Sequence, residues 1–321
     1  MFNSLPTYIL RRLGEILPLL FGLLTVVFFL ARLMPGDATD ALISPTIPAS
    51  VREQLREQFG LDRPLVDQYV SWIRSALRGD LGVSFTRAEP VTTVIAGVLP
   101  NTLVLGGAAL LIEVVLGVLL ALPVLWLHGT RREQLLSRLL LGVYAIPSFW
   151  IGMILLMVFS YWLGWFPSSQ MYSSDQYGSF SNLIAHLVLP ALTIAIPAAA
   201  ALARYMRSSL QNVQRQEFVL FARSLGLPRT KIVRSYILPN AASPLIALAG
   251  VEFGVLMTGV LVTETLYSWP GMGQLTVHAI FARDYPLIMG CVLVAGVVVA
   301  IGNLAADVAN AILDPRLRFT R

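Results

Sequence analysis

Side chains that commonly carry out catalysis are scarce in this chain of 321 residues. A loop that holds nucleotide phosphates needs the pattern G-x-x-x-x-G-K-[ST], and the sole lysine, Lys231, lies between a threonine and an isoleucine. The single cysteine, Cys291, excludes a disulfide framework, and the histidines are far apart in the sequence, at His128, His186 and His278. We therefore expect no catalytic residue, no metal site and no cofactor bound by this chain.

Acidic side chains inside apolar segments are the first candidates for a functional role. Near the bilayer centre a charged side chain costs at least ~2.5 kcal/mol, so each of these acids needs a partner or water. Glu15 lies within one turn of Arg11 and Arg12, which predicts an ion pair at the membrane surface. Glu113 and Glu252 lie deeper, and each either makes structural hydrogen bonds or lines a path for a solute. Glu252 belongs to the pattern G-x-x-x-G, which allows two helices to approach closely.

A second group of candidates lies in the late polar connection "TETLYSWPGMGQLTVHAIFARDYP". Glu264 and Asp284 could attract the amino terminus of a peptide, and Tyr267 with Trp269 could form an apolar gate. The alternative for the two aromatic residues is the belt that tyrosine and tryptophan form at membrane surfaces.

The stretch "FARSLGLPRTKIVRSYILP", from Phe221 to Pro239, carries four positive charges and no acid between two apolar segments. Residues 208–224 are predicted to form a helix that Gly226 closes in a left-handed conformation, and Pro228 can begin a second helix that ends near Pro239. A hairpin of this size cannot bury its apolar face alone. It must pack on membrane helices, on anionic lipid or in a groove of another protein.

The elements that position these residues follow from the composition, which is 56% hydrophobic and only 13% charged. A membrane-spanning helix needs about 20 mostly apolar residues. Six segments meet this length, so the sequence predicts an all-α membrane protein with six spans: Leu13–Ala31, Asn101–Leu127, Leu139–Phe166, Leu183–Ala203, Pro244–Val262 and Pro286–Ala306.

The orientation follows from the lysines and arginines, which favour the cytoplasmic side of a membrane. They are concentrated in residues 126–138, in residues 204–239 and at both ends of the chain, whereas residues 164–182 contain none and residues 263–285 contain only Arg283. Both termini and the basic stretch are therefore predicted to be cytoplasmic.

Three parts follow along the chain. Residues 1–34 form an N-terminal segment with the first span, and residues 35–100 form an outer helical insertion in which Pro64 begins a helix that ends at Gly79. Residues 101–321 form a five-helix core with a cytoplasmic loop at about 208–243.

The basic stretch resembles the cytoplasmic coupling loop of ABC importer permeases, with the pattern E-A-A, three residues, G, nine residues, I-x-L-P. The chain keeps Ala222, Gly226, Leu238 and Pro239, and it departs from the pattern at residues 220, 221 and 236. Other segments resemble the dipeptide, oligopeptide and nickel subfamily of these permeases in the same order along the chain. They are "RRLGEILPLLFGLLTVVFFLARLMPGD", "FGLDRPLVDQYVSWIRSALRGDLGVSF", the late connection quoted above and the tail "DPRLR".

This resemblance implies the fold of a type I ABC importer permease in the bacterial inner membrane. The chain would form half of a path for di- and oligopeptides and pair with a homologous permease subunit, two ATPase subunits that bind ATP and Mg²⁺, and an extracytoplasmic binding protein. Membrane lipid is expected as a partner and nucleic acid is not. The residues expected to couple to the ATPase are Glu217, Ala222, Arg223, Gly226, Arg229, Lys231, Leu238 and Pro239.

Other functions stay open from the sequence. Nickel chelates or another small solute could be the cargo. A carrier driven by protons through Glu113 and Glu252 is a rival, although such carriers usually show repeated halves. A purely structural subunit is another. ATPase subunits that co-purify with the chain would favour the importer, and transport that collapses with the proton gradient alone would favour the carrier.

Overall fold

The structure of the protein is a computed structural model, which describes residues 5–33, 53–54, 57, 60, 62–127, 129–242 and 260–313. The chain forms two compact units, each assembled from segments that are distant in the sequence. Unit 1 contains residues 1–11, 103–269 and 299–321, and unit 2 contains residues 12–102 and 270–298. Helices dominate the described residues, which include no strand longer than the isolated bridge between Val83 and Pro90.

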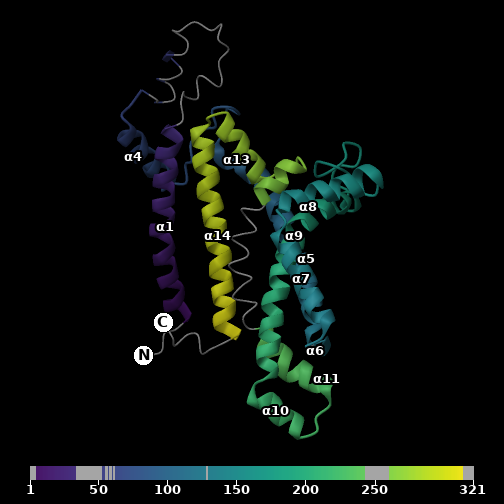
Figure 1. The fold of residues 1–321 in the computed structure, drawn as a ribbon. Coiled ribbons are helices and arrows are strands. Elements are labelled where there is room, and N and C mark those ends of the chain that lie inside the picture. The colour runs from purple at the N-terminus through teal and green to yellow at the C-terminus, as the bar shows by residue number, and fades with distance from the viewer. Residues whose placement is uncertain are drawn as a thin grey trace. The chain divides into compact units, whose positions relative to one another are not determined.

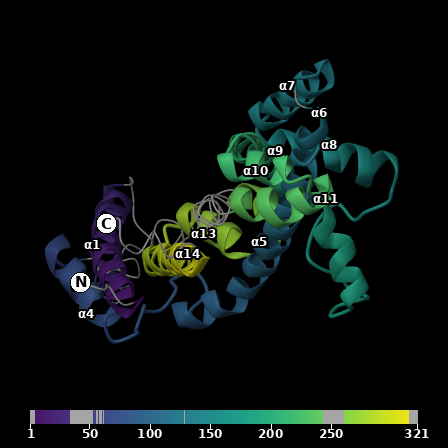
Figure 2. The same ribbon diagram turned by 90° about the horizontal axis from the view of Figure 1, so that it is seen from below.

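Unit 1 is organised around α9 (Phe180–Gln214), a helix of 35 residues. The short helix α6 (Val124–Leu127) follows α5 (Val91–Ala121), and both α6 and α7 (Arg131–Ala145) pack against α9 (Figures 1 and 2). At the other end of α9 lies α8 (Ser148–Leu155), which continues into the π-helical segment η1 (Leu156–Trp162). The length of α9 allows one helix to hold elements at both of its ends.

The third predicted span, residues 139–166, is not the single straight helix that its apolar composition suggested. Helix α7 ends at Ala145, α8 begins at Ser148, and the two helical segments are bent by 94° (Figure 1). Pro147 explains the break, because proline disfavours helical conformation in the residue before it. Accordingly, Ile146 has an extended backbone with φ −76° and ψ 128°.

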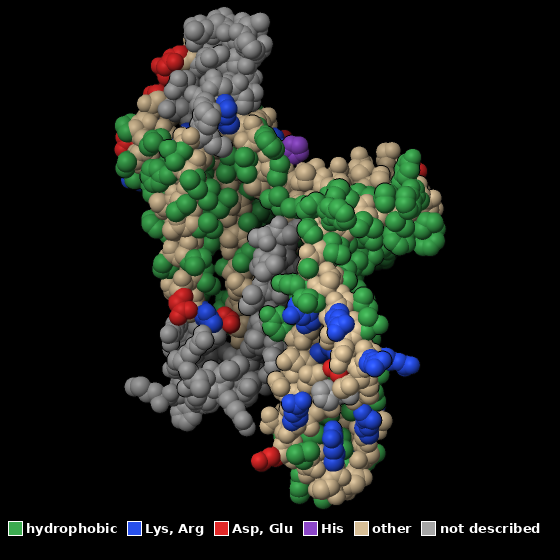
Figure 3. Space-filling view, viewed as in Figure 1, with side chains coloured by type: hydrophobic (Ala, Val, Ile, Leu, Met, Phe, Trp, Pro, Cys, Tyr) green, Lys and Arg blue, Asp and Glu red, His purple; other side chains and the backbone are tan. Residues whose placement is uncertain are grey.

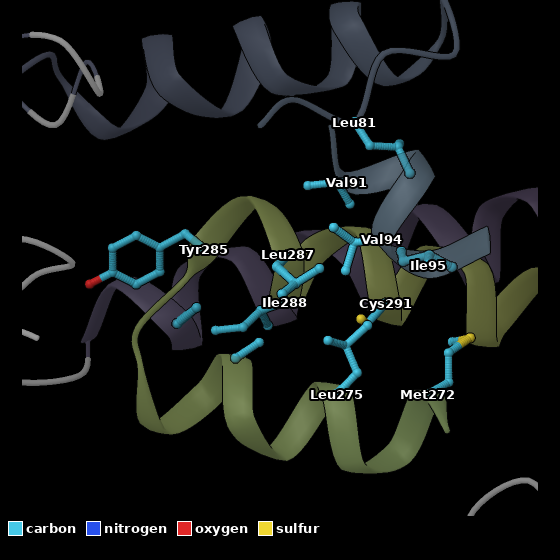
Figure 4. Close-up of a cluster of buried hydrophobic side chains, with 12 residues drawn as sticks. Leu81, Val91, Val94, Ile95, Met272, Leu275, Tyr285, Leu287, Ile288 and Cys291 are labelled. Carbon is cyan, nitrogen blue, oxygen red and sulfur yellow. The ribbon is translucent and has the colours of Figure 1, made fainter. Parts of the chain in front are cut away.

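Unit 2 contains α1 (Leu5–Leu33) from residue 12 onward, α4 (Leu65–Ala76), the first part of α5, α13 (Met272–Phe281) and the first part of α14 (Tyr285–Leu313). Its core gathers side chains of α5, α13 and α14 around Leu275, Leu287 and Cys291 (Figure 4). Gly290 permits this packing, because a Cβ atom there would lie 2.4 Å from Cγ1 of Val91. The start of α5 and α14 therefore approach each other closely.

The helix predicted to begin at Pro64 is confirmed as α4. The helix ends at Ala76, before the predicted Gly79, which adopts a left-handed conformation with φ +82° in the turn that follows. Tyr69 of α4 packs on Phe28 of α1 with ring centroids 5.1 Å apart, and its hydroxyl contacts that of Thr25. These contacts fix the helix on the end of α1.

Four described helices are long and apolar enough to cross a membrane, and the bent pair of α7 with α8 and η1 makes a fifth if it forms one span. They correspond to five of the six predicted segments. The remaining segment, residues 244–262, lies outside the described residues except for its last three.

Candidate functional site

The hairpin predicted from the basic stretch is present at the end of α9 (Figure 1). The predicted helix 208–224 is nevertheless two helices, because α9 ends at Gln214 and α10 (Glu217–Ser224) begins after an extended Gln216. The break lets the chain fold back, so that Val219 and Ala222 of α10 are buried with Met206 of α9. The helix breaks, although the sequence pattern favours one continuous helix, because the break allows this apolar face to be buried on α9.

The turn of the hairpin is a glycine-closed helix end, as the sequence predicts. Gly226 has φ +72°, a backbone conformation that residues other than glycine rarely adopt. The N–H of Leu227 donates to the carbonyl of Ala222 at 3.4 Å, and the N–H of Gly226 donates to that of Arg223 at 3.0 Å. This pair of bonds is the Schellman motif, which satisfies carbonyls at the end of α10.

The second arm begins directly after Pro228 as α11 (Arg229–Ile232) and continues as the π-helical segment η2 (Val233–Ile237). The prediction that it ends near Pro239 is wrong, because residues 238–242 are also helical. Proline offers no N–H to the helix ladder, and the widened turn immediately before Pro239 accommodates this loss. The side-chain amide of Asn240 donates to the carbonyl of Tyr236 at 2.7 Å.

The hairpin packs on the end of α9 and on the short helix α6. Its buried residues, including Ile232 and Ile237, form one cluster with Leu210 of α9 and with Val124 and Leu125 of α6. A guanidinium nitrogen of Arg229 donates to the carbonyl of Leu125 at 2.6 Å. A displacement of the hairpin must therefore act on α6 as well as on α9.

The outer side of the hairpin is basic and partly apolar. Arg223, Arg229 and Lys231 are exposed, as is Glu217 at the start of α10. Figure 3 shows Lys and Arg side chains gathered over this end of unit 1, whereas hydrophobic side chains cover α8. Phe221 and Leu225 at the turn are 64% and 61% exposed. Of the other expected coupling residues, Leu238 is half-buried and Pro239 is exposed.

A buried ion pair that sequence reasoning missed joins α7 to α9. Glu133 accepts hydrogen bonds from Gln211 at 2.7 Å and from Arg207 at 3.3 Å, and Arg207 also donates to Ser137 at 3.0 Å. Thr130 caps the start of α7, because its hydroxyl accepts the N–H of Glu133, and the other carboxylate oxygen of Glu133 accepts the N–H of Gly129, the residue before the cap. The pattern T-x-x-E is visible in the sequence, but its buried partner on α9 is not.

The residues expected along a solute path are buried in this conformation. Glu113 of α5 is 1% exposed and Glu264 is fully buried. Tyr267 and Trp269 are also buried, so they do not form the aromatic belt that was the alternative. The hydroxyl of Tyr267 donates to the carbonyl of Gly152 at 3.2 Å and contacts that of Thr193 at 2.9 Å. Burial raises the pKa of Tyr267 to about 12, so the phenol stays protonated at neutral pH.

Asp284 lies in unit 2 and is committed to structural hydrogen bonds. One carboxylate oxygen accepts from Ser84 Oγ at 2.6 Å and from Oγ1 and N of Thr86 at 2.8 and 3.0 Å. The other oxygen accepts the N–H of Leu287 in the first turn of α14 at 3.2 Å. The side chain is fully buried, so the expectation that it attracts a peptide finds no support in this geometry.

The structure thus gathers the expected coupling residues into one hairpin, whereas the expected path residues are divided between the two units. The remaining path residue, Glu252, lies outside the described residues. None of the described residues form a group of three or more His, Cys, Asp or Glu side chains that could hold a metal ion.

Comparison with known families decides what this helical arrangement is. Residues 113–319 match the family described as binding-protein-dependent transport system inner membrane component, and residues 5–106 match the description of its N-terminal region. The chain belongs to this family. Members of the family are non-enzymatic membrane components of transporters in which the ATPase is a separate subunit.

Individual proteins agree with this family of permeases. The chain is 35% identical to the oligopeptide transport system permease protein AppB of Bacillus subtilis, over 97% of this chain and 99% of that protein. It is 33% identical to the di/tripeptide transport system permease protein DppB of Pseudomonas aeruginosa, over 98% and 99% of the two chains. The resemblance to peptide permeases of ABC importers is therefore confirmed.

A solved structure supports the fold independently. A chain of the MetNI methionine ABC transporter, in an inward-facing conformation, superposes with a TM-score of 0.54. The match covers 69% of this chain and 96% of that chain at 15% sequence identity. The helical arrangement is thus one that ABC transporters use.

Proposed function

We propose that the chain is one transmembrane permease subunit of an ATP-driven importer and forms half of the path for di- and oligopeptides. The single observation that carries the coupling role is the Schellman-closed basic hairpin, which is anchored on both α6 and α9. The peptide cargo rests on the relatives, which are named as oligopeptide and di/tripeptide permeases. Nickel chelates and proton-driven transport have no comparable support.

The proposed assembly contains a second, homologous permease subunit, two ATPase subunits that bind ATP and Mg²⁺, and an extracytoplasmic binding protein that delivers peptide. The chain would cross the bacterial cytoplasmic membrane six times, with residues 244–262 as the span outside most of the described region. Both termini and the hairpin would face the cytoplasm. The concentration of Lys and Arg in residues 126–138 and 204–239 supports this orientation.

In this mechanism the hairpin inserts into a groove of an ATPase subunit and moves when the two ATPase subunits close. The motion would reach α6 through the buried cluster and the Arg229–Leu125 hydrogen bond. It would reach α7 through α9 and the Glu133–Arg207 pair. The displacement of one cytoplasmic loop thereby becomes a displacement of α6, α7 and α9.

Glu113 and Glu264 remain proposed path residues together with Tyr267 and Trp269. Because all four are buried in this conformation, we infer that they contact peptide only in another state of the transport cycle. Substitution of Glu264 by Ala should lower peptide uptake while the ATPase subunits still bind. Uptake that stays intact would remove Glu264 from the proposed path.

Substitution of Gly226 tests the coupling role directly. A valine at φ +72° is strained, and it would distort the turn that presents the docking surface. Gly226→Val should reduce the ratio of peptide transported to ATP hydrolysed by at least roughly fivefold in proteoliposomes, because ~1–3 kcal/mol of strain opposes the docked conformation. Gly142, which has no neighbour within 4 Å of an added Cβ atom, provides a control variant, Gly142→Ala. A normal ratio in Gly226→Val would contradict the coupling mechanism.

A further inference from the structure

Beside the hairpin lies a half-open cavity. Its volume is about 500 Å³. Residues of α6, the end of α9 and both arms of the hairpin line it, namely Leu125, Trp126, Gln214, Arg223, Leu227, Arg229, Ile232, Val233 and Ile237. All of these residues belong to unit 1.

The polar side chains that line this cavity supply mainly hydrogen-bond donors. The guanidinium of Arg223 makes no hydrogen bond or ion pair with the described parts of the chain, and Arg229 uses one guanidinium nitrogen for the carbonyl of Leu125. Nε2 of Gln214 is buried and has no hydrogen-bond partner among the described residues. No acidic side chain belongs to the lining. The cavity therefore offers positive charge and an unused amide donor.

This lining selects the chemistry of the occupant. A metal cation is excluded because the lining has no carboxylate, imidazole or thiol and carries two guanidinium groups. An apolar occupant would leave the amide of Gln214 unsatisfied, which is unfavourable for a buried donor. A carboxylate accepts hydrogen bonds from both guanidinium and amide groups. The apolar part of the lining, which includes Ile232 and Ile237, suits a short hydrocarbon stem.

We infer that the cavity receives an aspartate or glutamate side chain of the ATP-hydrolysing subunit, a reading that rests on the proposed function. Phe221 and Leu225, which each lie two residues from Arg223 in the sequence, are largely exposed at the turn. The surface of a protein partner can cover this apolar area and also neutralise the positive charge of the cavity. A small free anion would neutralise the charge but leave the apolar area exposed. Residues 217–239 carry four Lys and Arg against one acid, which is complementary to an acidic groove.

The test measures the affinity of the ATPase subunits for the permease pair in nanodiscs of neutral lipid. Arg223→Glu places a like charge opposite the inserted acid and should weaken binding by at least roughly tenfold. Gln214→Leu removes the buried amide, so it should leave the thermal midpoint of the isolated permease unchanged or higher and still weaken ATPase binding. If Gln214 had only a structural role, Gln214→Leu would not weaken ATPase binding while the stability of the permease is kept. Unchanged binding in both variants would overturn the inference.

The matched control is Arg234→Glu, which makes the same charge change at an exposed residue of the hairpin outside the cavity. It should weaken binding by less than roughly threefold, because exposed charges at the rim of an interface contribute little. An equal loss of affinity in Arg234→Glu would show that ATPase binding depends on the net charge of the hairpin and not on the cavity. A loss in Arg223→Glu that appears only with anionic lipid would assign the cavity to a lipid headgroup and overturn the proposal.

Photo-crosslinking identifies the occupant. A photoreactive residue in place of Arg223 should crosslink to an ATPase peptide that contains Asp or Glu beside the reacted position. A crosslinked ATPase peptide without an acid would contradict the inference. If wild-type ATPase subunits do not bind the permease at all, the proposed function itself fails. If they bind and the cavity variants have no effect, only the inference about the cavity fails.

Discussion

At the scale of single residues, the position of a carboxylate in a predicted connection did not reveal its role. Asp284 occupies a polar stretch between apolar segments, where a residue that contacts a solute is expected. In the structure it holds Ser84 and Thr86 against the start of α14 through three accepted hydrogen bonds. Because these partners are about 200 positions away in the sequence, no local pattern indicates them.

Replacement of Asp284 by Ala should destabilise unit 2, because the hydroxyl of Ser84 and the N–H of Leu287, both buried, would lose their acceptor. Buried donors without an acceptor cost about 1–3 kcal/mol each, so a total loss of at least ~2 kcal/mol is expected. Thermal unfolding of the purified permease in detergent measures it, with Asp175→Ala at an exposed site as the control. Full stability combined with lost peptide uptake would instead restore Asp284 to the solute path.

At the scale of elements, α9 is the helix on which unit 1 depends. Its predicted span, Leu183–Ala203, describes only the apolar middle of a helix that extends from Phe180 to Gln214. The part beyond residue 203 carries Arg207 and Gln211, which bind Glu133 of α7. Polar residues at the end of a membrane helix thus determine which neighbour the helix is joined to.

The Glu133–Arg207 pair should have a large effect when one partner is removed. The two side chains are 12% and 6% exposed, and loss of one member of a buried pair typically costs about 3–5 kcal/mol. Arg207→Met alone should therefore lower the thermal midpoint strongly, and adding Glu133→Gln should recover part of the loss. Arg207→Lys should be intermediate.

A second measurement on these variants separates coupling from stability. If the pair carries motion from the hairpin to α7, the double variant should hydrolyse ATP with less peptide transported per ATP, even where its stability is recovered. A transport ratio equal to that of the wild type in the double variant would restrict the pair to a structural role. Proteoliposomes with the complete transporter provide this ratio.

At the scale of the whole molecule, the two units combine segments that are far apart in the chain. Residues 12–102 form one unit with residues 270–298, although 167 residues of unit 1 lie between them in the sequence. The three-part division predicted along the chain, at residues 34 and 100, stays a prediction. It follows apolar segments and their connections, whereas the units follow which side chains pack together.

The proposed orientation can be tested with single cysteines in a chain in which Cys291 is replaced by Ala. A charged thiol reagent added to intact cells should label Asp175→Cys, in the predicted outer connection, and should not label Arg132→Cys, in the predicted cytoplasmic connection. Both positions are exposed in the structure. Inverted membrane vesicles should give the opposite pattern. Labelling of both positions from the same side would contradict the alternation on which the six spans depend.

The sequence alone determined the helical membrane class, five of the segments that are helical in the structure, the glycine-closed turn at Gly226 and the family. These features depend on local chemistry: long apolar segments, a left-handed glycine and a proline that begins a helix. Only the tertiary structure decided that Pro147 bends the third segment by 94°, that α10 folds back on α9, and that Asp284 and Arg207 bind distant partners. These features depend on which surfaces meet in space, and buried polar groups find their partners there without leaving a local pattern in the sequence.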